Sequence, residues 1–299
     1  MSSRAVVGRE AVEVGNVEFA VLGPLSVTDG DRPVTLGSYK QRSLLALLLI
    51  HRGSVVSTDR IIDELWGAEA EADRHNALWV HISNLRSELE PNREQRSEGT
   101  VVRTRAPGYF LDLEDDQVDA ARFETMLGTG RSLMVEDPEA AATTLRHALE
   151  LWRGRPYEDV TYESFAQAEI ARLDELRLEA VEARIEADLL RGLSAELTSE
   201  LETLTVQHPL REGLTAQLML ALHRSGRKAE ALRAYQGQRT RLAAELGLDP
   251  SAGLRDLESR ILADDPSLAG PAFRAGPAGA GPGLAVRGYE IREELGTDA

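Results

Sequence analysis

The chain contains no cysteine, and only two of its 34 basic residues are lysines, Lys40 and Lys228. Without cysteine it can form no disulfide, no thiolate nucleophile and no thiolate zinc site. Long apolar runs are also missing: the longest, residues 44–50, has the length of a core segment and is far too short for a bilayer span. Residues 1–13 lack an apolar signal core. We therefore expect a cytoplasmic protein without a membrane segment.

Motifs of common enzyme classes are missing as well. The sequence has no Gly-x-x-x-x-Gly-Lys-Ser/Thr loop for phosphates and no Gly-x-Ser-x-Gly elbow for a nucleophilic serine. Its six histidines are scattered, and no pair combines metal-ligand spacing with a carboxylate on the same predicted helix face. We expect no catalytic residues, no metal site and no cofactor.

The formal net charge is −16, which by itself argues against binding to a polyanion. The charges are unevenly distributed, however. Three stretches contain no carboxylate, and all three lie in the first 113 residues: 36–58, 74–87 and 101–111. Acidic residues concentrate from Glu114 onward. This asymmetry is typical of a DNA-binding domain joined to an acidic interaction domain.

The first 113 residues predict a small sheet, three helices and a hairpin. Residues 17–27 indicate a strand broken at Gly23-Pro24, and a short second strand follows around 34–36. Helices are expected from Ser38 to about His51, at 59–65 after a cap at Ser57 or Thr58, and from Asp73 to about residue 90. Residues 100–105 and 109–113 predict two strands joined at 106–108.

The third predicted helix has two different faces. At about 100° per residue, an apolar stripe forms on one side, comprising Leu78, Ile82, Leu85 and Leu89. The opposite side is polar except for one valine, with an aromatic and a basic residue on its flank: Asn76, Val80, Ser83, Asn84, Ser87, Trp79 and Arg86. Amides that read bases and a small apolar group that meets a thymine methyl suit a helix in the major groove. A solvated face of an ordinary amphipathic helix is the alternative.

The predicted hairpin favours the DNA-binding interpretation. Arg103 and Arg105 are two residues apart on one strand, so their side chains project to the same side. With Tyr109 they would lie beside a phosphate backbone.

From residue 117 onward the pattern is helical almost throughout. Helices are expected at 119–133, 138–151, 164–191, 194–207, 211–225, 228–246 and 251–262. Gly192, Ala195 and Glu196 recur 34 residues later as Gly226, Ala229 and Glu230, a period that matches the tetratricopeptide repeat (TPR). Such repeats stack into curved, protein-binding arrays. An irregular helical bundle is the alternative.

The C-terminal stretch has a different composition. Residues 265–286 are rich in Ala, Gly and Pro and predict a linker. Residues 287–296 faintly resemble the opening strand of a protein-kinase domain. We thus expect four segments: a flexible N-terminus (1–15), a DNA-binding domain (16–113), a helical domain (114–264), and a linker with the start of a further segment (265–299).

Several motifs, in the same order along the chain, resemble the Streptomyces antibiotic regulatory protein (SARP) family, which includes AfsR-like regulators. In the first domain they lie at 41–49, 57–67, 76–86 and 107–109. In the second domain they include Trp152, Gly154, Pro156 and Tyr157, and the run 244–250. The likeness covers about residues 17–264.

The resemblance implies a mostly α fold with a small β component: an OmpR-type winged helix-turn-helix followed by a TPR-like bacterial transcriptional activation domain. It implies an activator that binds direct repeats near promoters, recruits RNA polymerase through its sigma factor and core subunits, and controls secondary metabolism. A homodimer through either domain is compatible with it. The positions expected at DNA are Lys40, Arg42, Arg74, His75, Asn76, Trp79, Val80, Ser83, Asn84, Arg86, Ser87, Arg103, Arg105 and Tyr109.

The sequence departs from the family pattern on the third helix. Family members usually carry glutamine where Trp79 stands and arginine at the positions of Asn84 and Ser87. Fewer cations would neutralise fewer phosphates and give a shallower salt dependence. Two further functions remain open at this point: a protein-binding adaptor built on the repeats, and the regulatory N-terminal part of a larger kinase-like signalling protein.

Overall fold

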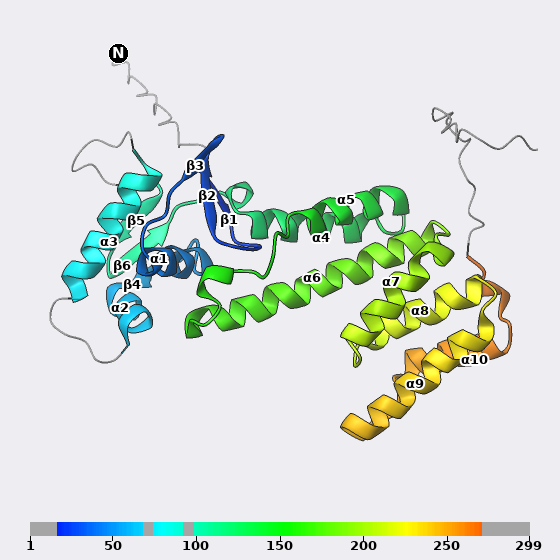
Figure 1. Cartoon of the computed structure of the whole chain (residues 1–299). Helices are drawn as coiled ribbons and strands as arrows, with labels where there is room; N and C mark the ends of the chain where they lie inside the picture. The colour runs from blue at the N-terminus through cyan, green and yellow to red at the C-terminus, as the bar shows by residue number, and fades with distance from the viewer. Residues whose placement is uncertain (1–16, 68–73, 92–98, 271–299) are drawn as a thin grey trace, which may run out of the picture.

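A computed structural model describes residues 17–67, 74–91 and 99–270 of the chain (Figure 1). Its N-terminal part alternates short strands and helices: β1 (Val17–Ala20), β2 (Ser26–Asp29), β3 (Arg32–Val34), α1 (Tyr39–Ile50), β4 (Val56–Ser57), α2 (Thr58–Trp66), α3 (Arg74–Leu89), β5 (Val102–Arg105) and β6 (Gly108–Leu111). The predicted order of sheet, three helices and hairpin is confirmed. Residues 1–16 and 271–299, including the kinase-like stretch, and Asp73 lie outside the described residues.

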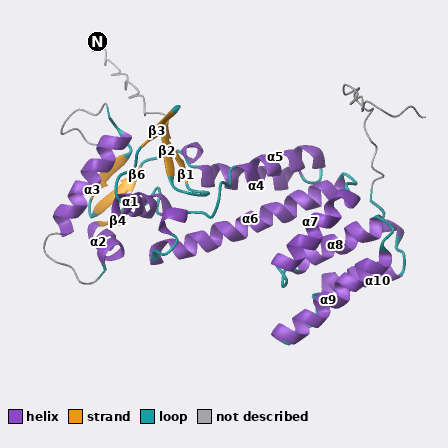
Figure 2. Ribbon diagram, in the orientation of Figure 1, coloured by secondary structure: helices purple, strands orange, loops and turns teal. Residues whose placement is uncertain are grey.

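The rest of the described chain is helical (Figure 2). It comprises η1 (Asp115–Gln117), α4 (Asp119–Leu133), α5 (Pro138–Glu150), η2 (Glu158–Val160), α6 (Ser164–Leu190), α7 (Ser194–Gln207), α8 (Glu212–Arg224), α9 (Lys228–Leu246), α10 (Ala252–Leu262) and η3 (Pro266–Leu268). All seven predicted helices are present, with ends within one residue of the expected positions. No helix in the described ranges is long and apolar enough to cross a membrane.

Local capping explains where the N-terminal helices begin. The side chain of Ser38 accepts a hydrogen bond from the backbone of Gln41 at the start of α1, and Ser57 does the same for Arg60 at the start of α2. The interior of α1 is buried from Ser43 to Leu49 on every side. Because a helix that is apolar all round must be covered all round, α1 forms the centre of the N-terminal part.

Two three-stranded antiparallel sheets flank this helix, with strand orders β1-β2-β3 and β4-β6-β5. The expected break at Gly23-Pro24 separates β1 from β2, which pair with each other. Gly23 has φ of 156°, and a Cβ atom there would lie 3.0 Å from Cβ of Arg153 in the helical part. Glycine therefore permits the close approach of the two parts at this turn.

The hydrophobic core does not divide at residue 113. One continuous cluster of buried residues runs from Val17 through Leu44 and Phe123 to Ala187, so the N-terminal part and the first helices of the second part share it. The two predicted domains therefore share one core where they meet. The sequence could not reveal it because apolar periodicity shows which residues are buried without showing against what.

A second cluster begins within α6 at Ile185 and extends to Leu268. Here the predicted repeat has a structural counterpart: Gly192 and Gly226 both have positive φ, 86° and 76°, and each ends a helix. One residue further on, Leu193 N bonds to Asp188 O, and Arg227 N bonds to Leu222 O. The same glycine-dependent turn therefore recurs after 34 residues.

The predicted linker begins too early. Leu268 is only 5% exposed and packs in this second cluster, and its carbonyl accepts a hydrogen bond from Arg224 Nε at 2.9 Å. The folded part thus continues past residue 265, because one leucine among small residues and prolines is enough to anchor this short segment.

Candidate nucleic-acid interface

Helix α3 lies at one end of the molecule, opposite to α7–α10 (Figure 1). Its predicted apolar stripe is buried: Leu78, Ile82, Leu85 and Leu89 are each at most 2% exposed. These side chains belong to the core that surrounds α1. The stripe fixes the rotation of α3 about its axis and turns its opposite face outward.

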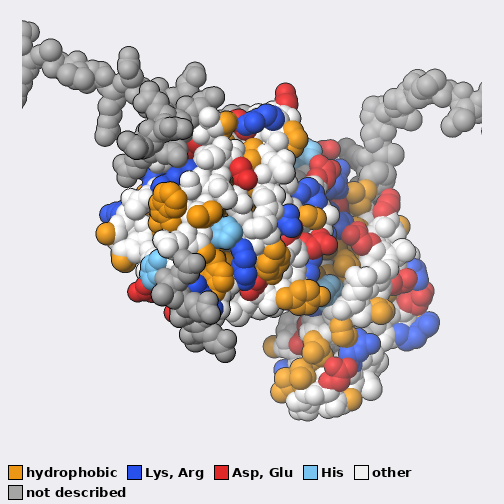
Figure 3. Space-filling model, turned by 60° about the vertical axis from the view of Figure 1, so that its left-hand side comes forward, with side chains coloured by type: hydrophobic (Ala, Val, Ile, Leu, Met, Phe, Trp, Pro, Cys, Tyr) orange, Lys and Arg blue, Asp and Glu red, His pale blue; other side chains and the backbone are white. Residues whose placement is uncertain are grey.

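The outward face carries the residues expected to read bases. His75, Asn76, Asn84 and Ser87 are exposed, and Ser83 is half-buried. Two apolar side chains are also exposed there, Trp79 at 66% and Val80 at 47%. The structure therefore places the predicted base-reading residues together on α3, at the end of the molecule away from α7–α10 (Figure 1). When this end is turned toward the viewer, exposed hydrophobic side chains are visible among uncoloured and basic ones (Figure 3).

Strands β5 and β6 form the wing beside α3. Arg103 and Arg105 are both exposed on β5, as their spacing predicts. Gly108, which follows the turn, packs against β4 so closely that a Cβ atom would lie 1.8 Å from the carbonyl oxygen of Val56. Only glycine fits this contact, and it holds the wing against the start of α2.

Arg86 joins α3 to the wing. Its Nε donates to the carbonyl of Val102 at 2.9 Å, its Nη2 donates to Thr104 Oγ1 at 2.7 Å, and its guanidinium lies 6.0 Å from the ring centre of half-buried Tyr109. Arg86 is one of the residues expected at DNA. Its contacts instead give it a positioning role, holding helix and wing in a fixed relation.

Two further cations expected at DNA bind the C-terminal end of α2. Lys40 Nζ donates to the carbonyl of Leu65, and Arg74 Nη1 donates to the carbonyls of Trp66 (2.7 Å) and Gly67 (3.2 Å). Basic side chains stabilise a helix C-terminus because they satisfy its free carbonyls and oppose its dipole. A carbonyl does not neutralise a cation, so both charges still contribute to the potential of this surface.

Ion pairs engage two other expected phosphate contacts. Arg42 lies 3.4 Å from Asp159 of η2, and Arg103 pairs with Asp112 on the solvent side of the wing. Arg105 has no such partner among the described residues and is exposed. Of the arginines predicted at the backbone of DNA, Arg105 alone is both exposed and free within the described chain.

A buried junction connects this surface to the helical part. Asp119, 2% exposed, accepts hydrogen bonds from the backbone of Val21 (2.8 Å) and Leu22 (3.1 Å), and Arg153 Nη2 lies 3.6 Å away. Burial raises the pKa of Asp119, while the backbone hydrogen bonds and Arg153 act in the opposite direction. Leu25 N also donates to Asp159 at 2.6 Å.

Tyr157 completes this junction. It adopts a left-handed conformation (φ 52°), is 1% exposed, and donates its backbone N–H to Val21 O at 2.8 Å. Burial raises the pKa of its hydroxyl far above the usual range. Sequence reasoning missed the role of Asp119 and Tyr157, because an acid in the first turn of a helix and an aromatic after proline are unremarkable locally.

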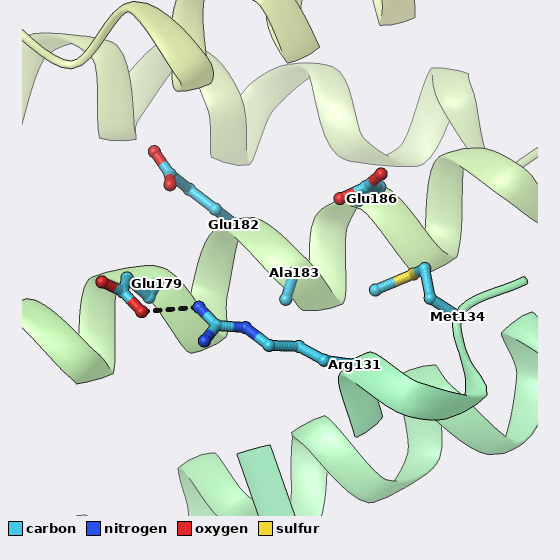
Figure 4. Close-up of a pocket in the computed structure, with 6 residues that line it drawn as sticks. All are labelled: Arg131, Met134, Glu179, Glu182, Ala183 and Glu186. Atoms are coloured by element: carbon cyan, nitrogen blue, oxygen red, sulfur yellow. Dashed lines mark hydrogen bonds and ion pairs between the residues drawn. The ribbon is translucent and has the colours of Figure 1, made fainter. Parts of the chain in front are cut away.

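The hollows on the helical part have a different character. One of about 240 Å³ lies between the end of α4 and α6 and is lined by Arg131, Met134, Glu179, Glu182, Ala183 and Glu186 (Figure 4). Arg131 pairs with Glu179 across it. Three carboxylates make this surface unsuited to DNA. Among residues 17–67, 74–91 and 99–270, no group of three His, Cys, Asp or Glu side chains could hold a metal ion.

A three-helix unit with a solvent-facing third helix, an adjoining wing and a fused helical domain defines a class: winged-helix transcriptional regulators with a helical activation domain. Comparison of the sequence supports this class. A family profile described as "Transcriptional regulatory protein, C terminal" matches residues 31–111, and one described as "Bacterial transcriptional activator domain" matches residues 118–262.

Individual relatives agree. The chain is 38% identical over 256 residues to regulatory protein DnrI of Streptomyces peucetius, covering 84% of this chain and 94% of that protein. It is 42% identical over 261 residues to regulatory protein AfsR of Streptomyces coelicolor, covering 87% of this chain but only 26% of AfsR. The solved structure of Mycobacterium tuberculosis EmbR in complex with a low-affinity phosphopeptide superposes with a TM-score of 0.79 at 34% identity, over 85% of this chain and 68% of that one.

The chain belongs to the SARP family of transcriptional regulators. It spans about a quarter of the AfsR relative and almost the whole of DnrI.

Proposed function

We propose that this regulator binds double-stranded DNA at direct repeats near promoters and activates transcription by recruiting RNA polymerase, in the control of secondary metabolism. Helix α3 enters the major groove and the wing lies along the neighbouring phosphate backbone. The observation that carries this proposal is the open outward face of α3, with its amides and hydroxyls beside the free guanidinium of Arg105.

The chemistry of the two elements assigns them different tasks. Asn76, Ser83 and Asn84 offer hydrogen-bonding groups that match base edges in the major groove. Arg105 and Tyr109 on the wing contact phosphates, which position the protein without reading sequence. Lys40 and Arg74 add positive potential near the same end, although their head groups bind carbonyls of α2.

The shared core gives the helical part a fixed place relative to DNA. One cluster of buried residues runs through the N-terminal part and α4 to α6, so these three helices are packed against the DNA-binding part as one body. Helices α7 to α10 pack in the second cluster, which begins within α6. A surface for RNA polymerase on the helical part, for its sigma factor or core subunits, is then presented at a set distance and angle from the binding site.

A gel-shift titration across salt tests DNA binding. The full chain is titrated against fragments selected from random DNA, between 50 and 200 mM salt, and we expect the affinity to fall as salt rises. An adaptor that binds only proteins would retard no fragment at any salt concentration. The variant Arg131→Ala loses an exposed cation of the helical part, away from the proposed interface, and serves as a control. We expect it to show the same salt dependence as the wild type.

Run-off transcription tests the recruitment of polymerase. From a promoter that carries the selected site, the full chain is expected to raise the yield of transcript. Moving the site by about five base pairs, half a helical turn, places the rigid helical part on the opposite side of the duplex and removes the activation. Equal activation at both spacings would contradict a fixed contact with polymerase.

A further inference from the structure

The basic side chains of α3 are occupied within the protein. The helix has two arginines and no lysine: Arg74 donates to the carbonyls of Trp66 and Gly67, and Arg86 donates to the carbonyl of Val102. Both guanidiniums are therefore turned away from the outward face. This bears on base choice, because arginine or lysine bound to O6 and N7 is the commonest specific contact to guanine.

The groups that remain on the outward face suit A·T pairs. Side-chain amides such as that of Asn84 pair with N6 and N7 of adenine, and apolar groups contact the C5-methyl of thymine. His75, exposed in the first turn, lacks the planar fork of donors that matches the two acceptors of guanine.

Two apolar side chains are prominent on this face. Trp79 is 66% exposed and Val80 is 47% exposed, although the helix buries its four leucine and isoleucine side chains almost completely. At about 100° per residue, Trp79 and Val80 lie on the two sides of Ser83, so they border the hydroxyl on both flanks. Such exposed apolar surface on one face marks a contact surface.

We propose that α3 reads a half-site composed mainly of A·T pairs, with Trp79 and Val80 packed against the C5-methyl groups of two thymines. This inference rests on the proposed function and names the sequence class that the same surface selects. A second copy of the chain covering Trp79 is the other possible occupant, and the experiment below separates the two.

The test replaces single thymines by deoxyuridine in a duplex selected from random DNA. This change removes one methyl group and leaves the base pair intact. We expect the full chain to lose affinity about fourfold at each thymine whose methyl packs on Trp79 or Val80, the effect of removing one buried methyl-sized group. Replacement at other thymines changes nothing.

The variants assign the contact. Trp79→Gln is expected to bind the thymine and deoxyuridine forms of its position equally, and Val80→Ala does the same at a different position. Tyr162→Ser removes another highly exposed aromatic, 97% exposed, outside α3 and serves as the matched control; it retains the full thymine preference. The opposite result is that Trp79→Gln keeps the thymine preference, loses the same factor of affinity for both duplexes and loads less cooperatively. That result would assign Trp79 to a contact with a second copy and overturn the proposal.

Tryptophan fluorescence gives a second measurement. Of the three tryptophans, Trp152 is 8% exposed, Trp66 is half-buried and Trp79 is 66% exposed, so a bound duplex changes the surroundings of Trp79 most. We expect its emission to change on addition of DNA in the wild type and in Tyr162→Ser, and to stay constant in Trp79→Gln. Salt-sensitive DNA binding with no difference between thymine and deoxyuridine would overturn this inference alone, whereas absence of all DNA binding would overturn the proposed function as well.

Discussion

Asp119→Ala tests whether the DNA-binding part and the helical part are one structural unit. The carboxylate is 2% exposed and accepts two hydrogen bonds from the first turn after β1, those of Val21 and Leu22. Alanine would leave both buried N–H groups without an acceptor and would remove the charge that faces Arg153. The substitution therefore acts at the junction and leaves α3 and the wing untouched.

The magnitude follows from the contacts. A hydrogen bond to a charged group contributes about 1.5–3 kcal/mol, so the two bonds together are worth roughly 3–6 kcal/mol. Burial raises the pKa of Asp119, which shows that desolvation of the carboxylate offsets part of this gain. We expect a net loss of about 2–4 kcal/mol in the free energy of unfolding.

Urea unfolding of the full chain measures this loss. Trp152, which packs edge-on against Phe123 at 5.3 Å in the shared core, reports the transition by fluorescence. Asp137→Ala is the matched control: it removes an aspartate that caps α5 through one exposed hydrogen bond, at a cost of about 1 kcal/mol. A loss for Asp119→Ala no larger than that of the control would refute the reasoning about the buried junction.

Three further predictions concern the DNA-binding end. Arg105→Ala weakens binding to every DNA sequence alike, by about 1 kcal/mol, and reduces the slope of log affinity against log salt by about 1; a gel-shift series measures both, and a loss confined to one sequence would contradict a phosphate contact. Asn76→Ala relaxes discrimination at one or two base pairs, at a cost of about 1–3 kcal/mol there, as competition with single-substituted duplexes would show; equal losses on cognate and random DNA would argue against base reading. Burial, and then the charge of Lys40, lowers the pKa of His81 below its value of about 6.5 in the unfolded chain. As the pH falls below about 6.5, the unfolded chain therefore takes up a proton at His81 before the folded chain does. The stability that the neutral ring provides is therefore complete above that pH and is lost as the pH falls toward the folded pKa. The free energies of unfolding at pH 7.5 and 5.5 should differ less in His81→Phe than in the wild type. The same difference in both proteins would exclude His81 as the cause.

Much of the fold could be predicted because its local signals agree. The α3 stripe from Leu78 to Leu89 has the helical period, the capping serines stand where α1 and α2 begin, and glycines close the helices of the repeat. Each of these depends on residues a few positions apart, which sequence pattern reports directly. The open face of α3 follows from the same periodicity once its stripe is buried.

Which basic side chains remain without a partner in the folded protein could not be predicted in this way. A stretch without carboxylates suggested a free cationic surface, yet Arg42 pairs with Asp159, more than a hundred positions along the chain. Arg74 and Arg86 bind backbone carbonyls, which every sequence contains and no composition reveals. Charge pattern along the chain identifies where cations are, and only the folded chain shows which of them remain available.

By itself the sequence determined the elements, their order, the buried stripe of α3 and membership in a family of regulators, because helical period, caps and motifs are local properties. The tertiary structure alone decided that both parts share one core through Asp119 and Tyr157, and that α3 presents amides and Trp79 instead of arginines. These outcomes depend on contacts between residues far apart in the sequence, and such contacts exist only after the chain has folded.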